Sequence, residues 1–308
     1  AMMVLGRDQI ALLGLYFLII KVLFYYWLSE DRQGAIRKSL GPLSAGAVVG
    51  ALIVTLPLLM TWLFAESSNR PVIDYEGAGR GSLHPAALMT WLVPNLYGVD
   101  GPLADYWGPP SKVWGNLDLY IARNMSALYM GILPVMAIVM IGVGRKALAS
   151  RAAWPLICCF LLSVLYALGR YSPLFDLFYH LPGTDLFRRP ADATFFIGVF
   201  GALLGGYCLS RALAGTLLPV NPIWFKGSML FMLLWMLGAI ALAFAKNQWS
   251  VAHVPVLTAS LFLLASQMLT ARAIERRGHP VVMVGFVTLF MLADLGFNNG
   301  PNESTALP

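Results

Sequence analysis

Long apolar segments dominate the sequence, and short polar or proline- and glycine-rich stretches separate them. A helix needs about 20 apolar residues to cross the hydrocarbon core of a bilayer. The pattern predicts an all-α fold: a polytopic membrane bundle of about eight transmembrane helices, with residues 1–308 as a single transmembrane domain. The predicted spans cover residues 9–28, 44–65, 126–143, 153–169, 193–210, 227–245, 254–270 and 280–293.

The composition supports a membrane location. Of the 308 residues, 58% are hydrophobic and 12% are charged, and the mean hydropathy is +0.71. A soluble globule of this size cannot bury so much apolar surface, which excludes soluble enzymes, nucleic-acid-binding proteins and disordered chains. The three cysteines, Cys158, Cys159 and Cys208, lie in apolar runs and are expected to be small core residues.

The distribution of charge predicts the orientation. One set of alternate loops carries eleven basic and three acidic residues, and the other carries nine basic and twelve acidic residues. The side rich in lysine and arginine is expected to be cytoplasmic. Both chain ends then face outside. Because the chain stops just beyond an apolar span, we expect it to be a piece of a longer protein.

Two long loops, about 66–125 and 170–192, fall on the predicted outer side, so chemistry is expected there. Within the first loop, residues 83–94 are too short to span a membrane and carry prolines near both ends, which predicts a short interfacial helix. Aromatic residues follow among turn formers: Tyr97, Tyr106 and Trp107. Two interpretations stay open, an aromatic belt at the headgroups or a platform for a sugar ring.

Arg188 and Arg189 stand just before the fifth span, on the side where positive charge is disfavoured. A guanidinium group offers a planar fork that suits phosphate. Two interpretations stay open here as well. The arginines either pair with Asp185, Asp192 or bulk lipid headgroups, or they bind a specific lipid phosphate or pyrophosphate.

Carboxylates in the outer loops are candidates for a general base or for ligands of a divalent ion. None has the spacing of a metal site, so no metal site is predicted, and the need for a divalent cation stays open. His84 and His180 are expected to be structural. Asp294, at the end of the last span, is either structural or part of a site. In the fifth span, Gly201, Gly205 and Gly206 form a small-residue face that favours close helix packing.

Short motifs in the outer loops and at the span ends carry a resemblance to a known family. The motifs are Leu92-Val-Pro94-Asn-Leu-Tyr97-Gly98, Tyr106-Trp107-Gly108, Leu119-Tyr120-Ile121, Gly131-Ile-Leu-Pro134, Ala167-Leu-Gly169-Arg-Tyr171-Ser-Pro173-Leu, Leu181-Pro182-Gly183, Phe187-Arg188-Arg189-Pro190-Ala191 and Ala293-Asp294-Leu295. In this order the chain resembles the YfhO-type bacterial membrane proteins. That family belongs to a GT-C-like group of polytopic glycosyltransferases that use polyprenyl-phosphate sugars. The resemblance covers about residues 84–295.

The resemblance implies transfer of a sugar from a polyprenyl-phosphate donor to an envelope glycan or lipid. The reaction would take place at the exoplasmic face of a bacterial inner (plasma) membrane, and the partners would be membrane lipids and the lipid-linked sugar. Arg188 and Arg189 would contact the lipid phosphate, and Asp105 would be the catalytic candidate. The sugar or acceptor cleft would be lined by Trp91, Tyr97, Tyr106 and Trp107.

The chain departs from the family pattern in two places. Asp192 stands where the family often has a second arginine after the proline, and the acidic residue that these enzymes carry in their first outer loop has no counterpart here. Two other functions therefore stay open: a transporter or flippase of lipid-linked glycans, and a non-catalytic partner in envelope assembly. The spans contain few charges, which argues against an ion-coupled pump.

Overall fold

The computed structural model describes residues 8–66, 73–99, 105–115, 127–217, 221–275 and 279–299. These residues form helices and turns without a β-strand, so the predicted all-α class is confirmed. The chain divides into two compact units, each described here by itself. The first unit holds residues 1–79 and 176–188, and the second holds residues 80–175 and 189–308. The single transmembrane domain expected from the sequence stays a prediction.

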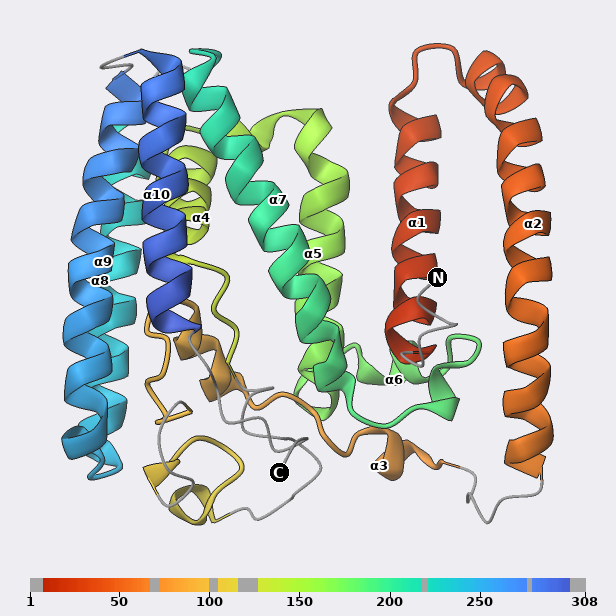
Figure 1. Ribbon diagram of the computed structural model, residues 1–308, viewed down its shortest axis with the longest axis horizontal. Helices are drawn as coiled ribbons and strands as arrows, with labels where there is room; N and C mark the ends of the chain where they lie inside the picture. Colours follow the sequence, from red (N-terminus) through yellow and green to blue (C-terminus); the bar gives the residue numbers. More distant parts are fainter. Residues whose placement is uncertain are drawn as a thin grey trace. The chain divides into compact units, whose positions relative to one another are not determined.

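The first unit is built on a pair of long helices, α1 (Asp8–Leu28) and α2 (Arg32–Glu66), which lie side by side (Figure 1). Both helices expose large apolar side chains, and Leu23 and Leu52 are 61% and 70% exposed. A helix that is apolar on its exposed faces needs lipid or protein around it. The unit also contains α3 (Tyr75–Ala78), most of α6 (Phe175–Tyr179) and the 3₁₀ helix η10 (Thr184–Leu186).

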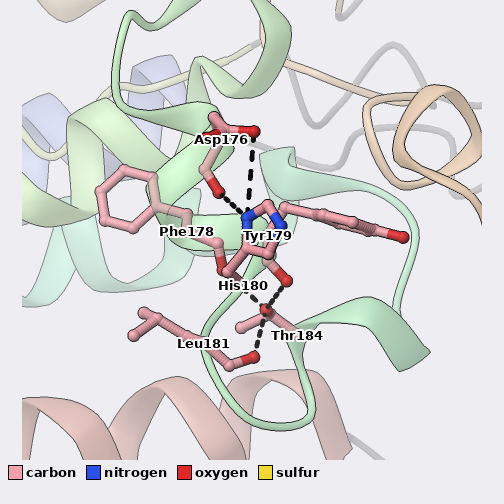
Figure 2. Close-up of polar contacts among 6 residues, drawn as sticks. All are labelled: Asp176, Phe178, Tyr179, His180, Leu181 and Thr184. Atoms are coloured by element: carbon pink, nitrogen blue, oxygen red, sulfur yellow. Dashed lines mark hydrogen bonds and ion pairs between the residues drawn. The ribbon is translucent and has the colours of Figure 1, made fainter.

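Hydrogen bonds to backbone carbonyls hold the segment after α6, as Figure 2 shows. The Thr184 hydroxyl lies 2.6 Å from the Phe178 carbonyl oxygen and 2.7 Å from that of Leu181. His180 Nδ1 lies 2.8 Å from the Asp176 carbonyl oxygen and 3.8 Å from its carboxylate. The imidazole therefore closes a local turn, which is the structural role expected for this histidine.

The Leu-Pro-Gly turn of the resemblance is attached to α1. The Tyr16 hydroxyl donates a 2.6 Å hydrogen bond to the Pro182 carbonyl oxygen. Gly183 has a φ of 81°, a left-handed conformation that favours glycine. This part of the motif thus has a structural explanation within the first unit.

The main helices among the described residues of the second unit are drawn in Figure 1. They are α4 (Ile132–Met136) with its π-helical continuation η6 (Ala137–Val143), α5 (Trp154–Ala167), α7 (Thr194–Leu213), α8 (Pro222–Ala245), α9 (Trp249–Glu275) and α10 (Pro280–Asn298). α7 packs against α5, and α4 packs against both α7 and α9. α8 packs against α9 and η6, and α10 packs against α9.

Six helices in the described part of the chain are long and apolar enough to cross a membrane. They are α1, α2, α7 together with the preceding 3₁₀ helix η11 (Pro190–Ala193), α8, α9 and α10. Shorter apolar helices, 132–143 and 151–167, stand where the third and fourth spans were predicted. The protein is therefore a multi-pass membrane protein, and the count of eight crossings stays a prediction.

Two glycines of α7 allow close approach: a Cβ on Gly201 would lie 2.1 Å from the Met130 sulfur, and Gly205 faces backbone. A Cβ on Gly205 would lie 2.6 Å from the Pro134 Cα, which is too close for two carbon atoms. A Cβ on the neighbouring Gly206 would meet nothing within 4 Å. Gly205 therefore lets α7 contact the backbone of α4 directly; of the predicted small-residue face, Gly201 and Gly205 pack closely and Gly206 does not.

Hydrogen bonds to backbone carbonyl oxygens join several segments at one end of the second unit, which we call the loop end. Leu83 N donates to the Ala167 carbonyl oxygen at the end of α5, over 2.8 Å. Asn95 Nδ2 donates to the carbonyl oxygen of Asn298 at the end of α10, over 3.2 Å. Lys246, just after α8, also contacts this end through the Val113 carbonyl oxygen, 3.5 Å from its Nζ. The opposite end of the second unit carries residues 144–153, which follow η6, and the turn at 214–217, which follows α7 (Figure 1).

Candidate functional site

The short helix predicted within 83–94 is present as η2 (Pro85–Trp91), a 3₁₀ helix. Apolar side chains on both sides of this helix pack into the core of the second unit: Leu83, Leu92 and Leu96 are almost completely buried. The interfacial position expected for this helix stays a prediction. Contact with the unit's own core accounts for the apolar side chains of this segment.

Tyr97 and Trp107 are core residues of the loop end, with 0% and 1% of their surfaces exposed. Their rings meet edge to face at 4.7 Å, and the Tyr97 hydroxyl donates a 2.6 Å bond to the Ala86 carbonyl oxygen. Burial raises the pKa of Tyr97, so its hydroxyl stays protonated. Tyr106, the third predicted ring of this segment, is only partly buried. The assignment of these rings to a sugar cleft stays a prediction.

Trp91 sits in an aromatic stack at the end of η2. Its ring lies 5.8 Å from that of Phe160 and 6.1 Å from that of Trp235, at interplanar angles of 30° and 19°. The buried Trp91 Nε1 has no hydrogen-bond partner among the described residues. An unsatisfied buried donor is costly, and the assignment of Trp91 to a sugar cleft stays a prediction.

Arg188 and Arg189 belong to different units, the first unit and the second unit respectively. Arg189 is exposed and has a left-handed φ of 67°. Its backbone N donates to the Arg80 carbonyl oxygen over 2.9 Å, which ties it to the start of the second unit. Contact of the two arginines with a lipid phosphate stays a prediction.

Asp105, the candidate catalytic carboxylate, is exposed on the loop end. Its backbone carbonyl approaches Gly98, where a Cβ would lie 3.1 Å from the carbonyl oxygen. Within the described ranges, no three His, Cys, Asp or Glu side chains lie close enough to hold a metal ion together.

Asp294, which the sequence left open, is a structural carboxylate. It is completely buried near the end of α10. Its oxygens accept hydrogen bonds from the Tyr129 hydroxyl, from Ile132 N at 2.8 Å and from Asn298 Nδ2 at 2.8 Å. This carboxylate therefore holds the start of α4 against α10, and its oxygens are already occupied.

His84 begins η2 and stands among aromatic rings. Its Nδ1 accepts a 3.1 Å hydrogen bond from Ala86 N, so the imidazole caps the helix and carries its proton on Nε2. The ring meets Trp114 at 4.8 Å and Tyr171 at 5.1 Å, both edge to face. Burial lowers the pKa of His84, which keeps the ring neutral.

Two cations flank this histidine. The positive charges of Arg170 and Lys246 lower the pKa of His84 further. Lys246 Nζ lies 4.4 Å from the centre of the Trp114 ring, and the Arg170 guanidinium lies 5.3 Å from that of Tyr171. Among the described residues, neither cation forms an ion pair with a carboxylate. We call the five side chains His84, Trp114, Arg170, Tyr171 and Lys246 the His84 patch.

The His84 patch was not recognised in the sequence, although one signal for it was present. Arg170 and Lys246 lie on the predicted outer side, where positive charge is disfavoured. The same signal singled out Arg188 and Arg189. What the sequence could not supply is the contact between His84, residues near 170 and a lysine that follows α8.

Comparison of the chain with protein-family models, with curated protein sequences and with solved structures found no match. The geometry defines the protein as an all-helical, multi-pass membrane protein with a cationic and aromatic patch at the loop end of its second unit.

Proposed function

We propose that the protein is a GT-C-like membrane glycosyltransferase of the bacterial plasma membrane. It takes a sugar from a polyprenyl-phosphate donor at the exoplasmic face and transfers it to an envelope glycan or lipid. The chain crosses the membrane eight times in this proposal, and the loop end faces outward. The observation that carries the proposal is the His84 patch, because two cations there lack a carboxylate partner among the described residues.

The patch suits the chemistry of such a donor. In the transfer, the bond between the sugar C1 and the phosphate oxygen breaks, and negative charge develops on the leaving phosphate. Arg170 and Lys246 would stabilise this charge, and the neutral His84 would donate from its Nε2–H. Trp114 and Tyr171 would supply apolar faces beside the phosphate for the sugar or the first isoprene unit.

An acceptor hydroxyl must lose a proton during the transfer. Asp105 is the candidate base, because its carboxylate is exposed at the same end of the same unit. Asp294 is unsuited to this role, since its oxygens are occupied by three donors. The resemblance noted in the sequence supports the same reaction class.

Lipid binding by the purified protein tests the proposal. Native mass spectrometry in mild detergent would compare the wild type with the double variant Arg170→Gln/Lys246→Gln. Loss of two charge-assisted contacts is expected to weaken polyprenyl-phosphate binding by at least about tenfold. Arg151→Gln, at the opposite end of the second unit, serves as the matched control and should bind like the wild type. Lipid binding by the double variant Arg188→Ala/Arg189→Ala tests the two arginines that the sequence analysis selected for phosphate binding.

A transfer assay with the same proteins separates the enzyme from other lipid-glycan proteins. A polyprenyl-phosphate sugar is offered with membrane acceptors, and released polyprenyl phosphate is measured. A flippase would bind the donor without releasing it. Unchanged lipid binding by the Arg170→Gln/Lys246→Gln variant would show that the His84 patch does not bind the donor phosphate. Donor binding by the wild type without release of polyprenyl phosphate would contradict the proposed glycosyltransferase activity.

A further inference from the structure

A groove of about 530 Å³ lies between η6 and the first turns of α8. Its volume is within the range of about 300–1,000 Å³ usual for small-molecule sites. The lining is apolar apart from one serine: Val139, Val143, Ile223, Trp224, Gly227, Ser228 and Phe231. The Ser228 hydroxyl already donates a 2.7 Å bond to the Phe225 carbonyl oxygen. The groove therefore offers mainly hydrocarbon contact.

The groove is open at its surface. Ile223 is 79% exposed, and Trp224, Phe231 and Val143 are between 42% and 52% exposed. A Cβ on Gly227 would meet nothing within 4 Å, so the absence of a side chain at this position contributes to the volume of the groove. On the other wall, η6 is a π-helix, and such segments often mark functional sites.

Basic residues lie next to the groove-lining residues in the sequence. Arg145 and Lys146 follow Gly144, where a Cβ would lie 2.9 Å from the Ser228 Oγ of the groove, and Lys226 stands between Trp224 and Gly227 in α8. Residues 137–153 and 221–245, which contain both walls, include no acidic residue. Arg145 Nε is buried and has no hydrogen-bond partner among the described residues. An apolar groove with cations next to its lining residues complements a lipid that carries a negative headgroup.

We propose that this groove binds an anionic phospholipid of the inner leaflet. One acyl chain lies along Val139, Gly227 and Phe231, and the phosphate contacts Lys226, Lys146 and the Arg145 guanidinium. The position agrees with the charge distribution, which predicts that this end of the second unit is cytoplasmic. Because lipid tails are as apolar as the groove, selection depends on shape and on the headgroup charge. This site is independent of the proposed glycosyl transfer.

The test titrates the purified protein with phosphatidylglycerol and with phosphatidylcholine of the same acyl chains, and counts bound lipid by native mass spectrometry. The wild type is expected to favour phosphatidylglycerol. Gly227→Leu fills the groove and should reduce the bound lipid several-fold. Gly238→Leu is the matched control, because Gly238 lies in the same helix, also has open space around it and does not line the groove.

The charge contribution is tested separately. Lys146→Gln/Lys226→Gln should reduce the preference for phosphatidylglycerol by about fivefold for each lysine, while phosphatidylcholine binds as before. Equal binding of both lipids by the wild type would overturn the proposal, and so would wild-type binding by Gly227→Leu. If the wild type is a dimer and Gly227→Leu is a monomer, a second copy of the chain occupies the groove, and this result would also overturn the proposal. Normal thermal denaturation of Gly227→Leu shows that the variant is folded.

Discussion

Asp294 shows how the surroundings of a single residue decide between a functional and a structural role. From the sequence alone, a carboxylate at the end of an apolar span is a candidate for a site. In the structure, hydrogen bonds from Tyr129, Ile132 and Asn298 satisfy its oxygens. A buried carboxylate with several donors anchors the groups that donate to it.

Replacing Asp294 by alanine is expected to destabilise the protein by about 3 kcal/mol, because three buried donors lose their acceptor. Asp294→Asn should cost less, since one oxygen remains. Unfolding of the purified protein in denaturing detergent measures both changes. Asp105→Ala, which removes an exposed carboxylate, is the control and should stay within about 0.5 kcal/mol of the wild type. An equally small effect at Asp294 would contradict the anchoring role.

His84 predicts a dependence of stability on pH. In the folded protein its pKa is lowered from 6.5 by burial and by Arg170 and Lys246. The stabilisation that comes from the neutral ring is therefore present above about pH 6.5 and is lost as the pH falls toward the folded pKa. Protonation also removes the Nδ1 acceptor that caps η2.

We expect the thermal midpoint of the wild type to fall further between about pH 7.5 and about pH 5 than that of His84→Asn. Asparagine keeps a capping oxygen and does not titrate. Differential scanning fluorimetry at a series of pH values measures the difference. Parallel pH profiles of the two proteins would show that His84 does not titrate with folding.

At the scale of the elements, contact between α4 and α7 depends on one glycine. Gly205→Ala would place a Cβ 2.6 Å from the Pro134 Cα and should cost about 2 kcal/mol. Gly206→Ala is the adjacent control: its Cβ meets nothing, and alanine is the better helix former, so stability should hold or rise slightly. Thermal denaturation in one detergent compares the two. A larger loss at Gly206 than at Gly205 would refute this packing.

The longest helices were the easiest elements to predict from the sequence. Long apolar runs such as 227–245 and 254–270 were placed correctly, because the cost of exposing peptide groups to lipid leaves a helix as the solution. Their ends were less certain, and α8 and α9 begin five residues earlier than predicted. The π-helical turn of η6 left no signal in the apolar pattern, since hydropathy is insensitive to one added residue per turn.

At the scale of the whole molecule, the sequence pointed to the two loops that hold His84 and Arg170, but not to Lys246 or to the contact among these residues. Arg170 and Lys246 are 76 positions apart in the sequence, and only the folded second unit brings both to His84. Tyr97 and Trp107 are a second example. Their aromatic character left an aromatic belt and a sugar platform open, and the sequence did not indicate that both rings are buried at the loop end.

The eight-crossing arrangement is tested by the side of the membrane on which Lys146 lies. In a variant without cysteines, Lys146→Cys should resist a membrane-impermeant thiol reagent in intact cells, whereas Lys112→Cys should react. Lys226→Cys is the inner reference. If the helices at 132–143 and 151–167 entered the membrane without crossing it, Lys146→Cys would react from outside and the chain would have six crossings.

The length of α2 gives the first unit a way to respond to the membrane. A helix of 35 residues is about 52 Å long, and even a 40° tilt leaves a projection of about 40 Å. The hydrocarbon core is only about 30 Å thick. The excess falls partly on the first two turns, where Arg32, Arg37 and Lys38 suit a headgroup layer. By changing its tilt, α2 can therefore adapt to bilayers of different thickness without losing its hydrophobic match.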